Sequence, residues 1–453
     1  MAKLELSESA MQAKDTARQQ RERRRPDSEP PEQPEYAKSH DHATEQAAQP
    51  PSDEGEGALD YDALWSRHSA EWRDTAQIAS QWSEAADTDP ALLSFTYGGA
   101  WWDVLAECGI TLIVTREYEH LLMAIACPDG RPLTSFMRMP HPSGLAVDRQ
   151  AGRVHVASTR NPNQVFDLMP VVDMTPRLDV SVEAVPERPL VPVLSRFFPG
   201  CLYMHDLAFV AGELHANAVG QNAIVRLNAD GSYDRLWWPR CIETAGGIIF
   251  GQNHIQLNSI AAGDSLEKSY FSASSAEIES LRPGHPDYPV DGRGVIFSGE
   301  TREPIARGLT RPHSARLHEG SLWVDNSGYG ELGLAEGGRF VTVSRLPGWT
   351  RGLCFYGQVV FVGTSRVIPR FRQYAPGLDV DESVCAVHAV DCRTGKVLGS
   401  LSWPSGNQIF AIDWVPAAIT TGFPFASTRL TDREKLLFYA FSAHGPKEDS
   451  NER

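Results

Sequence analysis

Polar residues that could bind a ligand recur at one place in a repeated sequence pattern. Each copy of the pattern begins with a short apolar run, and the residue just before that run carries a hydroxyl, imidazole, amide or guanidinium group in most copies. All of these groups form hydrogen bonds. In addition, a guanidinium group binds anions and an imidazole binds metals. The positions are Ser143, His205, Asn258, His313 and Arg351, with His141 two residues before the first of them.

The leading hypothesis is a ligand site in which these side chains face one another. Arg351 would hold a carboxylate or phosphate through its planar guanidinium, while histidine and asparagine supply oriented hydrogen bonds. This chemistry suits a small polar or anionic ligand, such as a sugar or a peptide-like molecule. The expected ligand-binding residues are His141, His205, Asn258, His313 and Arg351.

Three other readings of the same residues stay open. His205 and His313 could hold a divalent metal through ring nitrogens, with Asn258 or water completing the shell, in a metal-dependent enzyme whose catalytic residues remain unknown. The histidines could instead cap strand ends by hydrogen bonding to neighbouring repeats. Finally, the chain could be a scaffold that binds another protein and has no small-molecule site.

A search for established catalytic motifs mainly excludes classes of function. The run Gly328–Gly333 matches the dinucleotide-binding fingerprint, but it follows one strand pattern and leads into another, with no helix to receive a pyrophosphate. The sequence contains no Gly-x-Ser-x-Gly elbow, P-loop, His-Glu-x-x-His or EF-hand motif. Familiar hydrolase, nucleotide-binding and metalloprotease functions therefore lack support.

The elements that must position these residues are paired short strands. Apolar runs separated by Gly-containing turns extend from residue 104 to 115, 144 to 158, 206 to 217, 314 to 327 and 352 to 365, with weaker copies near Ser259 and Ala411. Turn sequences at 128–130, 228–231 and 391–396 predict further hairpins that supply the outer strands. Successive copies lie 62, 53, 55, 38 and 59 residues apart, counted from Ser143 to Phe410.

This spacing predicts an all-β fold, a single β-propeller of six or seven four-stranded blades over residues 91–442. Seven blades follow if the copy at Val104 counts separately, and six follow if the last copy is completed by another segment. Because the first strand of each blade lines the central channel, the polar positions would converge at one mouth of that channel.

The segments outside the propeller differ in composition. Residues 1–57 are polar and charged with almost no large apolar residues, which predicts a disordered tail, and 443–453 are expected to be disordered too. Residues 58–90 contain Leu64, Trp65, Trp72 and Trp82 at helical spacing, which predicts an amphipathic helix and a linker. Its apolar stripe could pack on the propeller or bind a partner protein.

Charge and cysteine content indicate which partners and which cellular compartment to expect. The formal net charge of −16 disfavours attraction to nucleic acid or an anionic membrane surface. The seven cysteines are scattered, without a Cys-x-x-Cys pair, so reduced thiols acting as small apolar residues are expected. With no signal-peptide or membrane-span pattern, the sequence predicts a cytoplasmic protein whose partner is a small polar ligand or another protein.

Four motifs carry a resemblance to a known family. The runs beginning at Ile113 (IVTREYEHLL), Met139 (MPHPSGLAV), Arg311 (RPHSARL) and Pro347 (PGWTRGL) resemble a bacterial family of conserved hypothetical proteins. That family is a domain of unknown function with a propeller-like repeat, and the likeness covers about residues 91–420. The resemblance implies a fold and carries no established activity or catalytic residue.

Overall fold

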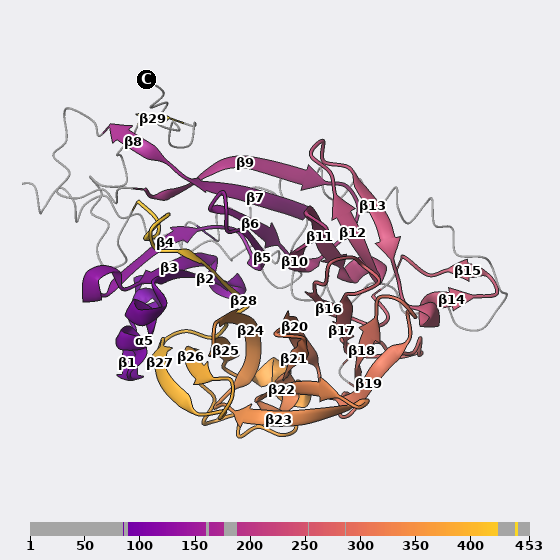
Figure 1. Ribbon diagram of the computed structural model, residues 1–453. Helices are drawn as coiled ribbons and strands as arrows, with labels where there is room; N and C mark the ends of the chain where they lie inside the picture. Colours follow the sequence, from indigo (N-terminus) through magenta and orange to yellow (C-terminus); the bar gives the residue numbers. More distant parts are fainter. Residues whose placement is uncertain are drawn as a thin grey trace, which may run out of the picture. The chain divides into compact units, whose positions relative to one another are not determined.

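The computed structural model describes Ala85 and residues 89–159, 163–175, 188–251, 253–285, 287–424 and 440–442. Within these residues, six antiparallel sheets of four or five strands are arranged as the blades of a propeller (Figure 1). The all-β prediction is therefore confirmed, and the number of blades is six. The expected tails at 1–57 and 443–453 lie outside the described residues, as does the expected helix apart from Ala85.

Each blade has one strand nearest the propeller axis, and these innermost strands contact one another in a closed circle (Figure 1). The circle runs from β5 through β10, β16, β20, β24 and β28 back to β5. The innermost strands are β5 (Pro142–Asp148), β10 (Met204–Val210), β16 (Leu257–Ala261), β20 (Pro312–His318), β24 (Trp349–Tyr356) and β28 (Ala411–Pro416).

The second and third strands of each blade form its buried middle. The second strands are β2 (Ile110–Arg116), β6 (Arg153–Ser158), β11 (Glu213–Ala218), β17 (Tyr270–Ala273), β21 (Ser321–Asn326) and β25 (Val359–Ser365). The third strands are β3 (Leu121–Ala126), β7 (Asn163–Pro170), β12 (Ala223–Leu227), β18 (Gly294–Ser298), β22 (Glu331–Glu336) and β26 (Ala386–Asp391).

The outer strands and the remaining elements complete the blades. The outer strands are β4 (Leu133–Arg138), β9 (Leu190–Phe198), β13 (Tyr233–Trp237), β19 (Pro304–Leu309), β23 (Arg339–Arg345) and β27 (Val397–Ser402), with β1 (Thr96–Gly99) as a fifth strand beside β27. Two small sheets pair β14 (Glu243–Thr244) with β15 (Gly247–Ile248) and β8 (Val172–Thr175) with β29 (Ala440–Ser442). Short 3-10 turns are η1 (Pro90–Leu93), η2 (Glu117–Glu119), η3 (Pro128–Gly130), η4 (Val219–Gln221), η5 (Arg240–Ile242), η6 (Ser327–Tyr329) and η7 (Pro369–Tyr374).

The last copy of the repeat closes the circle. Strand β28 pairs antiparallel with β2, so the blade that begins with β2 takes its innermost strand from the other end of the propeller sequence. This pairing explains why the repeat has seven copies and the propeller six blades. The hairpins predicted at 128–130, 228–231 and 391–396 are confirmed as the turns β3–β4, β12–β13 and β26–β27.

One predicted strand is wrong. The run that begins at Val104 was expected to form the first strand of a hairpin, but residues Trp101–Cys108 form the helix α5. Trp101, Val104, Leu105 and Cys108 are buried, and their spacing of three and four residues is that of one helical face. Gly109 then ends the helix in a left-handed conformation with φ of 62°.

Side chains join every pair of neighbouring blades by one repeated contact, named here the interblade ring. In each case a hydroxyl or amide near the start of an innermost strand or the end of a second strand donates to a carbonyl at the start of the next innermost strand. The donors and carbonyls are Thr115 to Ser143 (2.7 Å), Ser143 to Met204 (2.7 Å), Asn217 to Leu257 (2.7 Å), Asn258 to Pro312 (2.9 Å), Ser327 to Thr350 (2.7 Å) and Ser365 to Ile409 (3.0 Å).

The innermost strands approach so closely that small residues are needed just after the polar positions. A Cβ on Gly144 would lie 2.6 Å from the Cα of Asp206 in the next blade. Gly352 has a φ of 87°, and a Cβ there would lie 2.9 Å from the Ile412 side chain. The sequence therefore places glycine where two backbones meet and a left-handed conformation is required.

Candidate functional site

The predicted register is the observed one. Ser143, His205, Asn258, His313 and Arg351 each lie in the first three residues of an innermost strand, and Phe410 directly precedes the sixth such strand. These six positions therefore encircle one end of the channel. The structure brings four of their side chains into direct contact: His205, His313, Arg351 and Phe410.

Phe410 lies at the centre of this cluster. Its ring centroid is 5.5 Å from that of His205 and 5.8 Å from that of His313, and both histidine rings meet it edge to face. The guanidinium carbon of Arg351 lies 3.5 Å from the same centroid. A phenyl face suits both contacts, because its negative face attracts cations and the polarised edges of imidazoles. The four residues are named the channel cluster below.

Within the channel cluster, His313 is held in one protonation state. Arg351 Nε donates to His313 Nε2 at 3.1 Å, so Nε2 accepts and the proton lies on Nδ1, which donates to Ser314 Oγ at 2.9 Å. Burial lowers the pKa of His313 well below its usual value, and the charge of Arg351 lowers it further. His313 is therefore a neutral imidazole that orients the arginine.

Arg351 is a buried cation without a carboxylate partner. The residue is 7% exposed, and no described Asp or Glu forms an ion pair with its guanidinium. Burial lowers its pKa from 12.5 to about 10, although the charge of Glu117 opposes that effect. A buried charge is costly unless an opposite charge or hydrogen bonds compensate it, and Arg351 has no ion-pair partner of opposite charge among the described residues.

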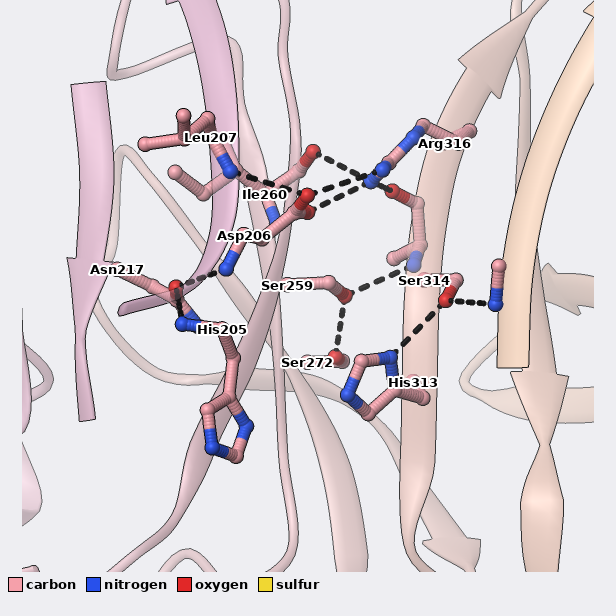
Figure 2. A network of polar contacts seen from close by, with 12 residues as sticks. His205, Asp206, Leu207, Asn217, Ser259, Ile260, Ser272, His313, Ser314 and Arg316 are labelled. Atoms are coloured by element: carbon pink, nitrogen blue, oxygen red, sulfur yellow. Dashed lines mark hydrogen bonds and ion pairs between the residues drawn. The ribbon is translucent and has the colours of Figure 1, made fainter. Parts of the chain in front are cut away.

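A second polar layer lies beyond the histidines in the channel (Figure 2). Asp206 and Arg316 form a bidentate ion pair between β10 and β20, with N–O distances of 2.7 and 3.0 Å. Asp206 also accepts from the backbone N–H groups of Leu207 and Ile260. Since the Asp206 oxygens accept all of these hydrogen bonds, this layer links three blades, those of β10, β16 and β20. The channel cluster is then the part of this region considered for ligand binding.

The remaining predicted residues, Ser143, Asn258 and His141, form contacts outside the channel cluster. Ser143 and Asn258 belong to the interblade ring, and the Asn258 amide also donates to Ser274 Oγ at 3.2 Å. These two side chains therefore form hydrogen bonds between neighbouring blades, a role that the sequence left open for the histidines. His141 packs edge-on against His120, with centroids 4.4 Å apart, and its backbone N–H donates to His120 Nδ1 at 3.2 Å.

Sequence reasoning missed a second buried arginine at the same end of the channel. Arg311 is 7% exposed, its guanidinium carbon lies 4.2 Å from the Tyr374 centroid, and it donates to Pro283 O at 2.9 Å and to Gln256 Oε1. It too forms no ion pair with a described carboxylate. Its charge lowers the pKa of Arg351, so the two guanidinium groups act on one another.

A repeated backbone feature of the structure includes Arg311. The residue two places before the polar position has a left-handed backbone in four blades, with φ between 44° and 55°. Such strained conformations of non-glycine residues collect at functional sites. These residues are His141, Tyr203, Gln256 and Arg311.

Two long insertions cover this end of the channel near Arg311. One joins β17 to β18 and the other joins β25 to β26, and their buried residues form a single apolar cluster with Trp349. Phe371 of the second insertion stacks on Tyr118, with centroids 6.2 Å apart, and Tyr374 donates to Gly284 O of the first at 3.2 Å. The insertions therefore surround Arg311 with partly apolar contacts, through Tyr374 and Pro283.

A metal at His205 and His313 finds little support in these contacts. Both ring nitrogens of His313 are engaged, by Arg351 and by Ser314. Among the described residues, no group of three or more His, Cys, Asp or Glu side chains is placed to hold a metal ion. Metal binding there would require His313 to exchange its arginine for the metal.

One protein family matches most of the propeller sequence. The sequence matches a family described as a domain of unknown function (DUF4915) over residues 99–422. The chain belongs to the DUF4915 family. The match begins at the last residue of β1 and ends after β28, so the channel cluster, Arg311 and Glu117 all lie inside the DUF4915 domain. No curated protein matches this chain.

Some solved structures resemble the chain at low sequence identity. A nidogen/laminin complex is 10% identical with a TM-score of 0.44, covering 68% of this chain and 98% of that one. A gluconolactonase from Xanthomonas campestris is 14% identical with a TM-score of 0.38, covering 66% and 86%. A PQQ-bound aldose sugar dehydrogenase from Streptomyces coelicolor is 17% identical with a TM-score of 0.36, covering 64% and 90%. These likenesses concern the fold alone.

Two other predictions concern the rest of the chain. All seven cysteines are free, and all but Cys241 are buried, in agreement with reduced thiols that pack as small apolar residues. The run Gly328–Gly333 spans the end of η6 and the start of β22, so a strand follows it, as the sequence predicted, and not a helix. In the described part of the chain, no helix has the length and apolarity needed to span a membrane.

Proposed function

We propose that this DUF4915 protein binds a small anionic ligand at the channel mouth, with Arg351 as the group that holds its negative charge. The observation that supports the proposal most is the buried, stacked guanidinium of Arg351, which has no ion-pair partner among the described residues. Arginine in such a position offers a planar, pre-oriented donor set for carboxylate or phosphate.

The surrounding residues would supply orientation. His313 fixes Arg351 through Nε, which directs the terminal nitrogens of the guanidinium away from that histidine. His205 is partly exposed beside it and can hydrogen bond a hydroxyl or carbonyl of a polar ligand. Asn258 and His141 remain members of the proposed site, the first through its amide oxygen and the second at the mouth.

A direct test is binding of isotopically labelled acetate, followed by carbon NMR, to the full chain and to Arg351→Gln. Acetate binding should fall at least roughly tenfold in Arg351→Gln, because the variant keeps hydrogen-bonding groups but loses the charge. Arg351→Lys should give an intermediate result, since an ammonium cannot reproduce the planar donor geometry.

The matched control is Arg339→Gln, which removes one positive charge from the exposed strand β23. This variant should bind acetate like the native chain. Equal acetate binding by the native chain and by correctly folded Arg351→Gln would refute the proposed function. Analysis of metal content in protein purified without a histidine tag tests the alternative metal site at His205 and His313.

A further inference from the structure

Glu117 is a buried carboxylate at the channel mouth that sequence reasoning did not single out. It begins η2, directly after strand β2, and is 4% exposed. Its Oε1 accepts from Thr159 Oγ1, and its Oε2 accepts from Gln408 Nε2 at 3.4 Å. None of the described basic residues forms an ion pair with it. Neutral donors thus hold Glu117 and leave lone pairs on its oxygens unfilled.

Glu117 belongs to the same site as Arg351. Gln408, which binds Glu117, also accepts from the Tyr118 N–H at 3.2 Å and lies two residues before Phe410, on which Arg351 stacks. Burial lowers the pKa of Arg351, and the charge of Glu117 partly opposes this. The two residues therefore act on each other electrostatically without forming an ion pair, so each keeps binding capacity for a ligand group.

The charges at the mouth favour a particular kind of ligand. Arg351 and Arg311 contribute two positive charges, Glu117 contributes one negative charge, and His313 is neutral. A buried site is most favourable when its charges balance. A ligand with one negative charge brings the net charge of this site to zero, and a ligand with two makes it negative. The free lone pairs of Glu117 in turn require a donor such as a hydroxyl group.

We infer that Glu117 determines specificity by restricting the channel site to ligands with one negative charge and a hydroxyl beside it, as in a hydroxycarboxylic acid. The inference rests on the proposed anion-binding function and adds the class of ligand. Arg351 holds the carboxylate, Glu117 accepts from the hydroxyl, and a second acidic group on the ligand is repelled by Glu117.

The native full-length chain tests this class with three small acids: acetate, glycolate and malonate. Glycolate adds a hydroxyl to acetate, and malonate adds a second carboxylate. Glycolate should bind more tightly than acetate, and malonate should bind roughly tenfold more weakly than glycolate. If the native chain binds malonate as tightly as glycolate, the inference is overturned without reference to any variant.

The variant Glu117→Gln removes the negative charge with little change in shape, and Glu336→Gln at the exposed end of β22 is the matched control. In Glu117→Gln, the affinity for malonate should rise at least roughly tenfold relative to the affinity for glycolate. Glu336→Gln should keep the native order of affinities, with glycolate bound more tightly than malonate. An unchanged malonate-to-glycolate ratio in Glu117→Gln, with acetate binding still lost in Arg351→Gln, overturns the role of Glu117 alone. Acetate binding that survives Arg351→Gln overturns the proposed function itself.

Discussion

The guanidinium of Arg351 lies 3.5 Å from the centre of the Phe410 ring, although the two residues belong to different blades. Arg351 comes from β24, and Phe410 immediately precedes the strand that closes the propeller. This contact therefore forms only when the last innermost strand has joined the circle. Anion binding and closure of the fold are expected to depend on the same aromatic ring.

Replacing Phe410 separates these two roles. Phe410→Leu should destabilise the protein by about 1–2 kcal/mol, because a buried ring is exchanged for a smaller apolar side chain. It should also weaken acetate binding by severalfold, because the cation loses its aromatic partner. Urea unfolding and acetate titration measure the two effects. Phe423→Leu, in the same apolar cluster but outside the channel cluster, should lower stability similarly and leave acetate binding unchanged.

The hydrogen bonds of the interblade ring predict that removing one hydroxyl group lowers the free energy of unfolding strongly. Ser365 Oγ donates to Ile409 O and accepts from Ile409 N–H, both at 3.0 Å, at the seam where the propeller closes. Ser365→Ala should cost about 2–3 kcal/mol of unfolding free energy, because two buried backbone groups lose their partner. Ser232→Ala, in the β12–β13 turn, should change the urea midpoint little. Equal midpoints for the two variants would contradict the importance of the ring.

Buried histidines make stability depend on pH. Burial lowers the pKa of His388 from 6.5 to about 4, while its ring nitrogens contact Thr364 and Ser400. The unfolded chain therefore takes up this proton at a higher pH than the folded chain, so stability is full above pH 6.5 and falls as the pH drops towards 4. The loss from this residue should approach about 3 kcal/mol.

The variant His388→Gln tests that loss. Its unfolding free energy, measured in urea between pH 7 and pH 4, should fall less steeply with decreasing pH than that of the native chain. The native residues His215, His254 and His313 also have lowered pKa values, so some slope should remain. An identical pH profile for native and variant proteins would show that His388 does not titrate as its burial implies.

Asp325 should limit stability at neutral pH. Its side chain is fully buried on β21, opposite His313 in the strand register. Burial raises the pKa of Asp325 well above its ordinary value, against the opposing effects of the Arg316 charge and the Ser314 hydroxyl. Because the folded carboxyl resists ionisation, it destabilises the fold at pH values above the unfolded pKa.

Asp325→Asn removes this penalty at neutral pH. The melting temperature at pH 7 should therefore rise, by the equivalent of about 1 kcal/mol or more, and the gain should shrink as the pH falls towards 3. Differential scanning calorimetry at both pH values measures the effect. A variant that is less stable than the native chain at pH 7 would indicate that the ionised carboxylate has a stabilising partner.

The sequence allowed the propeller and its register to be predicted because repeats encode both. The residues before the apolar runs are equivalent in the chain, and a closed circle of blades makes them equivalent in space. His205, His313 and Arg351 could be grouped in this way. Their contacts with Phe410 could not, because a phenylalanine at the same position carries no polar signal.

Other parts of the site depend on pairings between distant segments. The roles of Ser143 and Asn258 depend on which carbonyl lies across the blade boundary, and no local pattern specifies it. Glu117 and Arg311 looked like ordinary charged residues of a turn and a strand start. Only the folded chain shows that both are buried without an ion-pair partner. The helix at Trp101–Cys108 was missed because a strand period was assumed for an apolar run.

The pairing of β28 with β2 has a consequence for how the protein is made. A ribosome synthesises β2 early and β28 only after the five intervening innermost strands, so the first blade lacks its innermost strand while residues 117–410 are synthesised. Until residue 416 has left the ribosomal exit tunnel, the edge of β2 exposes unpaired backbone groups that other nascent chains could bind. Chaperone protection of that edge during synthesis would therefore serve this chain more than a propeller whose blades are each contiguous in sequence.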